Sequence, residues 1–167
     1  DTGESTCRNA AICIGGVSYP ATGSTGDGHR LAKEAGHANV PCRPSLVPLE
    51  SPDGYCAEMQ GFSLKNVTLT AFEDDRRIYR ELGEMMFTHF GVTGPLVLSA
   101  SAHMRDMDGH SYRLEIDLKP GLEEEKLDAR ILRDFEEQKN KEFKNALGGL
   151  AGRMMIPVLV RLSGIDP

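Results

Sequence analysis

The sequence of 167 residues lacks any apolar run long enough to span a bilayer, and no signal peptide is visible. It also lacks an excess of basic side chains, since its net charge is -6 and its isoelectric point about 5.4. Nucleic acids and anionic membranes attract basic patches, so this charge argues against either as the main partner. We therefore expect a cytoplasmic protein that binds neither nucleic acid nor membrane.

The four cysteines lack the C-x-x-C spacing, which argues against a metal site or a disulfide framework. We expect reduced thiols at Cys7, Cys13, Cys42 and Cys56. The sequence also lacks a G-x-S-x-G motif and any recognisable pair of nucleophile and base. No histidine has a metal-ligand spacing, so packing is the expected role of His29, His37, His89, His103 and His110. Catalytic residues therefore stay unassigned, and no metal is expected.

Both common glycine-rich nucleotide motifs are missing as well. Gly23 and Gly28 have the spacing of a P-loop, but His29 and Arg30 stand where that motif needs Lys followed by Ser or Thr. The G-x-G-x-x-G fingerprint is missing because the glycine spacing over residues 23–28 is reversed.

A glycine-rich loop is nevertheless present at residues 15–28, between an apolar run at 10–14 and a helical pattern at 30–35. A strand that leads through such a loop into a helix is the usual geometry for holding a phosphate or nucleotide, because glycine lets backbone amides approach an anion. From spacing alone, a structural turn and a ligand contact both remain open. The chain begins at Asp1 and the strand has nothing before it to pair with, which suggests a middle piece of a larger protein.

Alternation of apolar and polar residues predicts strands in the middle of the chain. The clearest is residues 112–118, where strict period two leaves one apolar face to cover a core. Strands are also predicted at residues 46–49, 62–72 and 77–82, and a parity shift around Asn66 predicts a β-bulge. This pattern favours an antiparallel sheet or a small barrel.

Helical periodicity takes over after Pro120. Apolar residues recurring every fourth position predict an amphipathic helix over residues 123–141. A second apolar helix is predicted at residues 155–162, with Gly164 as its end.

Shorter helices are indicated by capping residues. Thr93 can act as an N-cap and Pro95 suits a first helical turn, which predicts a short helix that runs to about Ala102. Gly36 is expected to follow the end of the helix near the N-terminus.

Three segments resemble consecutive motifs of one enzyme family. Residues 15–28 (GGVSYPATGSTGDG) are similar to the stretch ATGG-x-SYPATGSTGDG of the BaiN-like flavoproteins, the aminoacetone oxidase-like enzymes. Residues 43–49 (RPSLVPL) resemble their RPALVPL segment, and residues 83–95 (GEMMFTHFGVTGP) resemble GE-x-x-FTHFG-x-SGP. Ile14 replaces the usual Thr before the glycine pair, and the chain contains neither the family's G-x-G-x-x-G nor its C-terminal flavin-binding segment.

The resemblance implies part of an FAD-dependent, NAD(P)-linked oxidoreductase. In such flavoproteins an insert built from a small β-barrel and a helical part interrupts the nucleotide domain, and the flavin itself performs the hydride chemistry. The insert caps the reactive face of the flavin and helps shape the substrate site. The implied partners are the remainder of the same flavoprotein chain and a small-molecule substrate. We expect the isolated chain to be inactive and to bind FAD weakly or not at all.

The resemblance also implies which loop residues lie near the cofactor: Gly15, Gly16, Ser24, Thr25, Gly26 and Asp27. The expected fold class is α+β, a small antiparallel β-barrel or sheet with a helical lobe and a remnant strand–loop–helix of a Rossmann-like FAD domain. The expected boundaries are 1–36 for that remnant, 37–121 for the barrel and 122–167 for the lobe. The alternative is a stand-alone, non-catalytic module that binds a partner.

Overall fold

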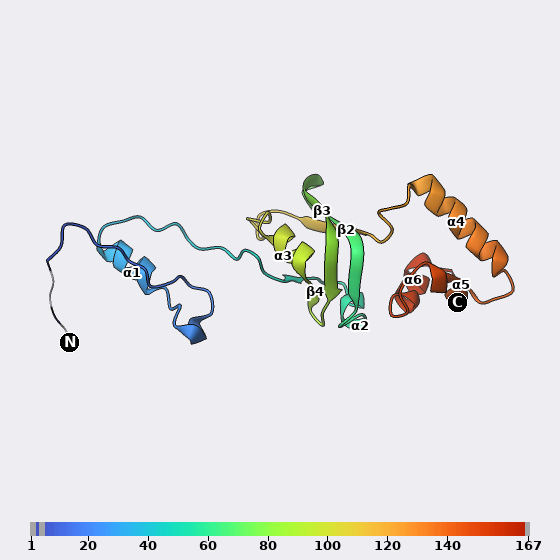
Figure 1. Ribbon diagram of the computed structural model, residues 1–167, viewed down its shortest axis with the longest axis horizontal. Coiled ribbons are helices and arrows are strands. Elements are labelled where there is room, and N and C mark those ends of the chain that lie inside the picture. The colour runs from blue at the N-terminus through green and yellow to red at the C-terminus, as the bar shows by residue number, and fades with distance from the viewer. Residues whose placement is uncertain (1–2, 4–5, 166–167) are drawn as a thin grey trace. The chain divides into compact units, whose positions relative to one another are not determined.

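The computed structural model describes residue 3 and residues 6–165, and the chain divides into two compact units, residues 1–42 and 43–167 (Figure 1). The helices and turns are η1 (Pro20–Thr22), α1 (Asp27–Glu34), α2 (Tyr55–Glu58), α3 (Pro95–Ser101), α4 (Glu124–Glu137), α5 (Phe143–Ala146), η2 (Leu147–Gly149) and α6 (Ile156–Ser163). The strands are β1 (Leu49–Glu50), β2 (Ser63–Glu73), β3 (Arg76–Phe87), β4 (Gly91–Thr93) and β5 (Tyr112–Asp117).

The first unit consists of irregular chain, η1 and α1. The strand predicted at residues 10–14 is wrong, because no strand lies in the described part of this unit and a single strand finds no backbone partner there. Ile12 and Ile14 are accordingly about half exposed, at 50% and 47%. Helix α1 is confirmed, and Gly36 follows its end with a φ of 87°, as expected for a helix terminator.

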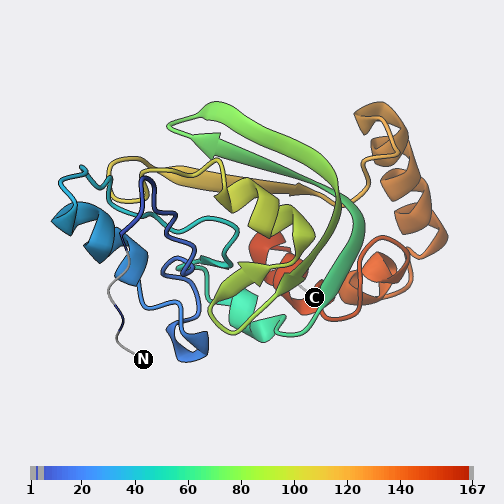
Figure 2. The same ribbon diagram turned by 60° about the vertical axis from the view of Figure 1, so that its left-hand side comes forward.

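The second unit is built on one antiparallel sheet with the strand order β1-β4-β3-β2-β5. The sheet curves into a half-barrel whose edges are β1 and β5 (Figures 1 and 2). The expected α+β class with an antiparallel sheet is therefore confirmed.

Strand β2 carries the predicted bulge. Its register with β3 shifts between Leu64 and Val67, and Asn66 has a φ of 53°. Strand β3 runs to Phe87, beyond the predicted end at residue 82, because β2 pairs with it up to Met86 and β4 pairs with Met86 and Phe87. Strand β1 is shorter and later than predicted, since Pro48 cannot donate to a ladder.

Helix α3 begins as predicted with Pro95 in its first turn, but the expected N-cap is wrong. Thr93 belongs to β4, where it pairs with Met86, and Gly94 occupies the cap position with a φ of 103°. A Cβ atom at Gly94 would lie 2.9 Å from the Cα of Met85. Close packing of the two backbones therefore determines this helix start.

The core lies between the sheet and helices α3 and α6 (Figure 2). Its most deeply buried large side chains are Leu69 of β2, Met85 of β3 and Val97 of α3. Met155, just before α6, and Val158 within it belong to the same buried cluster. Helix α6 is thus packed on the sheet and shares its core.

The two long C-terminal helices are confirmed with modified ends. Helix α4 stops at Glu137, four residues before the predicted end, and α6 is followed by Gly164 with a φ of 67°. The predictions did not include α5, a helix of one turn. Arg161 joins the C-terminal helices to α2, since it donates to both carboxylate oxygens of Glu58 at 2.8 and 2.9 Å. Among the described residues, no helix has the length and hydropathy needed to cross a membrane.

Candidate functional site

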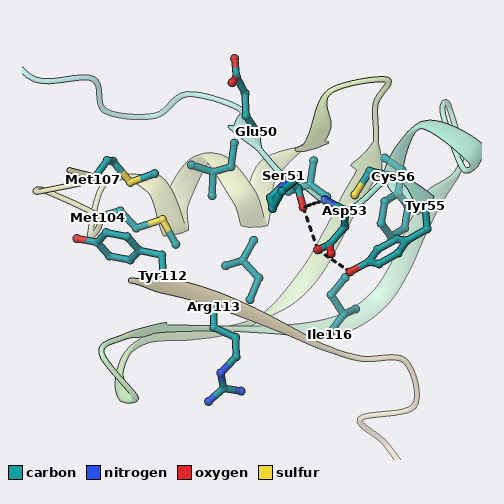
Figure 3. A pocket seen from close by; sticks show the side chains of 15 residues that line it. Glu50, Ser51, Asp53, Tyr55, Cys56, Met104, Met107, Tyr112, Arg113 and Ile116 are labelled. Carbon is teal, nitrogen blue, oxygen red and sulfur yellow. Dashed lines mark hydrogen bonds between the residues drawn. The ribbon is translucent and has the colours of Figure 1, made fainter. Parts of the chain in front are cut away.

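A pocket of about 370 Å³ lies between the two edge strands of the half-barrel, β1 and β5 (Figure 3). Apolar side chains from both edges and from the interior of the sheet form most of its wall, among them Leu49, Phe87, Val92, Leu114 and Ile116. A concave, largely apolar site with few polar groups is the usual form of a small-molecule site. The pocket is therefore the first candidate for a ligand site in the second unit.

A polar corner closes one end of the pocket, immediately after β1. Tyr55 Oη donates a hydrogen bond to Asp53 Oδ2 at 2.8 Å, and Ser51 Oγ donates to the same oxygen at 3.0 Å. The backbone N–H of Asp53 donates to Ser51 Oγ at 3.2 Å, which fixes the turn between them. Within the described residues, no donor reaches Asp53 Oδ1, so this oxygen is available to a hydrogen-bond donor of a ligand.

Two side chains that follow Asp53 at this corner, Tyr55 and Cys56, are neutral at physiological pH. Burial, followed by the hydrogen bond to Asp53, raises the pKa of Tyr55 to about 12. Burial also raises the pKa of the Cys56 thiol, which is 4% exposed. The corner thus offers an anchored carboxylate beside a neutral phenol and a neutral thiol.

The opposite end of the pocket is formed by Met104, Met107 and Tyr112 (Figure 3). Tyr112 Oη donates to Glu73 at 2.8 Å, and burial is the main cause that raises the pKa of Tyr112. The Arg113 guanidinium points away from the pocket and lies 4.4 Å from the centre of the Phe72 ring. Because no other lining side chain is cationic, the pocket is unsuited to a phosphate.

The six residues predicted to lie near a cofactor all belong to the first unit. The Gly26 N–H donates to the Gly16 carbonyl at 3.0 Å, and a Cβ atom at Gly15 would lie 3.3 Å from Ser24 Oγ. Thr25 Oγ1 donates to Asp27 Oδ2 at 2.8 Å. The loop therefore brings its two glycine-containing halves together at the start of α1.

This loop fits some parts of a flavin cofactor better than others. Gly15 and Gly26 have φ angles of 77° and 82°, and a Cβ atom at Gly16 would meet nothing within 4 Å, so a ligand can approach the backbone closely. The hydrogen bond from Thr25, followed by that from Arg30, lowers the pKa of Asp27 at the first turn of α1. An ionised carboxylate there repels a phosphate, so the loop suits hydroxyl or N–H donors of a cofactor.

The histidines show contacts that the sequence did not reveal. His110 Nδ1 lies 2.5 Å from Asp74 Oδ2, and this hydrogen bond is the main cause that raises the pKa of His110. The His89 ring meets the Phe90 ring edge-on, and the His103 ring lies at a tilt to the Tyr79 ring. Both histidines are exposed, so the packing role stays a prediction. Within residues 6–165 and residue 3, no group of three or more His, Cys, Asp or Glu side chains could hold a metal ion.

The polar corner of the pocket was not predicted from the sequence. The available signal was the Ser-Pro-Asp-Gly sequence at residues 51–54, which is typical of a turn with a side chain bonded to its own backbone. Nothing in the spacing indicated that Tyr55 would extend this turn into a pocket, because the apolar wall comes from strands much later in the chain.

Comparison with known proteins finds relatives with enzyme names. Ribosomal RNA dihydrouridine synthase of Haemophilus influenzae is 36% identical over 123 residues, which cover 71% of this chain and 28% of that protein. The Escherichia coli protein of the same name is 29% identical over 122 residues, 72% of this chain and 30% of that protein. A 3-dehydro-bile acid delta(4,6)-reductase of Clostridium scindens is 25% identical over 156 residues, 92% of this chain and 38% of that protein.

The chain thus spans about a third of the length of these relatives. The family described as HI0933-like protein barrel and H2TH domain matches residues 43–167, which are the whole second unit. The half-barrel followed by α4, α5 and α6 agrees with that description. The family resemblance found in the sequence is thereby confirmed, and the chain belongs to the HI0933-like flavoprotein family.

Proposed function

We propose that this chain is the insert region of a flavin-dependent oxidoreductase and that its second unit caps the flavin and lines the substrate site. The family match over residues 43–167 carries the proposal, and the relatives' names, a synthase of dihydrouridine and a reductase, support it. We further propose residues 1–36 as a remnant of the FAD-binding domain, 37–121 as the barrel insert and 122–167 as the helical lobe.

The cofactor in this proposal is FAD, held by the complete protein with help from the glycine-rich loop. The backbone at Gly15, Gly16 and Gly26 would lie against the cofactor, and Ser24, Thr25 and Asp27 would accept hydrogen bonds from its hydroxyl or N–H groups. When bound, the flavin supplies hydride transfer between NAD(P)H and the substrate. The residues of this chain contribute orientation and the exclusion of water.

The pocket between β1 and β5 suggests the class of substrate. Its apolar wall suits a ring, and Asp53 Oδ1 suits an N–H or O–H group on that ring. Tyr55 and Ser51 hold the carboxylate in place by donating to its other oxygen. The relatives are named for ribosomal RNA and for a bile acid, so the ring could belong to a small molecule or to a nucleotide of RNA.

The test uses the full-length protein that contains this chain. After reduction of the bound flavin by NAD(P)H, reoxidation is followed with ribosomal RNA and with a 3-dehydro-bile acid as two probes. We expect one of the probes to reoxidise the flavin. We expect Asp53→Asn to slow that step about tenfold while leaving reduction by NAD(P)H unchanged, because a hydrogen bond to a charged group contributes about 1.5–3 kcal/mol. Asp75→Asn, at a hairpin position with a 93% exposed side chain, is the matched control.

A protein without flavin, or a reading frame that begins near Asp1 with its own Met, would instead favour the stand-alone binding module. Equal reoxidation rates for the Asp53→Asn, Asp75→Asn and unmodified proteins would contradict the role assigned to the pocket.

A further inference from the structure

The charge of the C-terminal helices is distributed unevenly. Helix α4 has six acidic and three basic side chains, whereas residues 138–165 have five basic side chains and one acidic side chain, Glu142. A chain that is acidic overall therefore carries a basic segment around α5 and α6. Such segregation is typical of proteins in which one surface meets an anionic partner.

A hollow of about 430 Å³ lies within this basic segment. Its lining residues come from α5, from the turn before α6 and from the first half of α6: Lys144, Asn145, Arg153, Ile156, Pro157 and Val160. Lys144 and Arg153 are both exposed, so their charges are open to solvent at the rim. The hollow thus combines two cations and an amide with a partly buried apolar floor.

The hollow faces away from the core of the second unit. Met155 and Val158 fill the opposite face of α6 and belong to the buried cluster of the sheet. A Cβ atom at Gly152 would lie 2.9 Å from a ring carbon of Phe62, so the turn that carries Arg153 is pressed against the end of the sheet. The packing fixes the backbone beside the hollow and leaves its cationic side chains exposed at the rim.

The cations of the segment differ in whether they form ion pairs with acidic side chains of this chain. Arg161 is committed to Glu58, and Lys139 lies 2.8 Å from Glu136. Lys144 Nζ lies 2.8 Å from Glu142, at an exposed position where such a pair is weak and easily exchanged. Within the described residues, neither Arg153 nor Lys141 has an acidic partner, and Lys141 lies only 3.4 Å from the Gln138 amide oxygen. Lys144 and Arg153 are the two of these cations that line the hollow itself.

We propose that this hollow binds the sugar–phosphate backbone of RNA. Guanidinium and ammonium groups bind phosphates directly, and the apolar floor from Ile156, Pro157 and Val160 can pack against a sugar or a base. Lys141, three residues before Lys144, extends the basic surface beyond the hollow and suits an anion that continues as a chain. Only the choice of RNA as the ligand rests on the proposed function. Binding at the hollow requires no flavin, and the hollow lies apart from the pocket at Asp53.

The test measures binding of a short fluorescein-labelled RNA hairpin to the 167-residue chain by fluorescence anisotropy at low and moderate salt. We expect the unmodified chain to show saturable, salt-sensitive binding. The double variant Lys144→Gln/Arg153→Gln should have a roughly tenfold higher Kd, and its slope of log Kd against log salt concentration should be smaller by about two. Lys126→Gln/Arg133→Gln on the acidic helix α4 removes the same two kinds of charge and should bind as the unmodified chain does. Circular dichroism checks that both variants keep their helix content.

Because the whole chain is anionic, general electrostatics oppose RNA, and binding requires a local basic site. No saturable binding at low salt, or equal losses in both double variants, would overturn the proposal. Inorganic pyrophosphate that competes as well as unlabelled RNA at equal phosphate concentration would also overturn it and would indicate a small-phosphate site. A flavin-free full-length protein would refute the oxidoreductase proposal and leave this result unaffected.

Discussion

Replacing Gly91 with alanine should destabilise the second unit strongly. Gly91 pairs with Glu50 where β4 meets the edge strand β1, and its φ of 156° is rarely adopted by residues with a side chain. A methyl group there would collide with the carbonyl oxygen of Leu49 and lie 2.8 Å from the backbone nitrogen of Ser51. Both are backbone atoms, so rotation of a side chain cannot relieve the clash.

The expected cost combines two effects. The unfavourable backbone conformation costs about 1–3 kcal/mol, and overpacking adds about 1–3 kcal/mol. A loss of about 2–6 kcal/mol is a large part of the free energy of unfolding of a native domain, which is typically about 5–15 kcal/mol. Because Glu50 and Ser51 line the pocket, the same change should disturb the polar corner.

Urea unfolding followed by circular dichroism measures this loss in a chain that has no tryptophan. The matched control is Gly61→Ala, because Gly61 also has a positive φ, 82°, but a Cβ atom there would meet nothing within 4 Å. It should lose only about 1–2 kcal/mol. A Gly91→Ala variant as stable as the unmodified chain, or no less stable than Gly61→Ala, would refute the reasoning.

Further changes address the loop, the cofactor and two titrating groups. Gly26→Val should leave the free energy of urea unfolding of the second unit unchanged within about 0.5 kcal/mol, because no described residue of the first unit is buried. The same change should impair flavin loading of the full-length protein. The reverse pattern would mark the loop as structural. The isolated chain should bind FAD weakly or not at all, and saturable quenching of flavin fluorescence at low micromolar protein would contradict this. Asp74 raises the pKa of His110, so stability from this pair should be complete below about pH 6.5 and decline as pH rises through the raised pKa, and His110→Gln should abolish that decline in the urea midpoint. Burial raises the pKa of Tyr55 to about 12, so stability from the neutral phenol should be lost between about pH 10 and 12, and Tyr55→Phe should flatten the urea midpoint over that range.

The parts of the fold that local patterns determine were predicted well. The alternation in β2 and β5 and the parity shift at Asn66 located two strands and a bulge, because one face of each strand covers the core. The four-residue apolar repeat located α4, and glycine located the ends of α1 and α6. These signals act within a few residues of the element that they determine.

The features that the sequence did not reveal depend on distant contacts. Residues 10–14 look like a strand, but a strand exists only with a partner. Gly94 replaces Thr93 as the cap because the backbone at Met85 lies close to it. The pocket joins a turn at residues 51–55 to β5, more than fifty residues later, and its polar corner is visible only after the sheet has formed.

The proposed flavin-dependent activity is tested most directly by the flavin content of the full-length protein that contains this chain, measured together with anaerobic reduction by NADH and NADPH. We expect equimolar FAD that one of the two nucleotides reduces, with bleaching of the visible flavin absorbance. A folded full-length protein that stays free of flavin after incubation with excess FAD, or a bound flavin that neither nucleotide reduces, would contradict it.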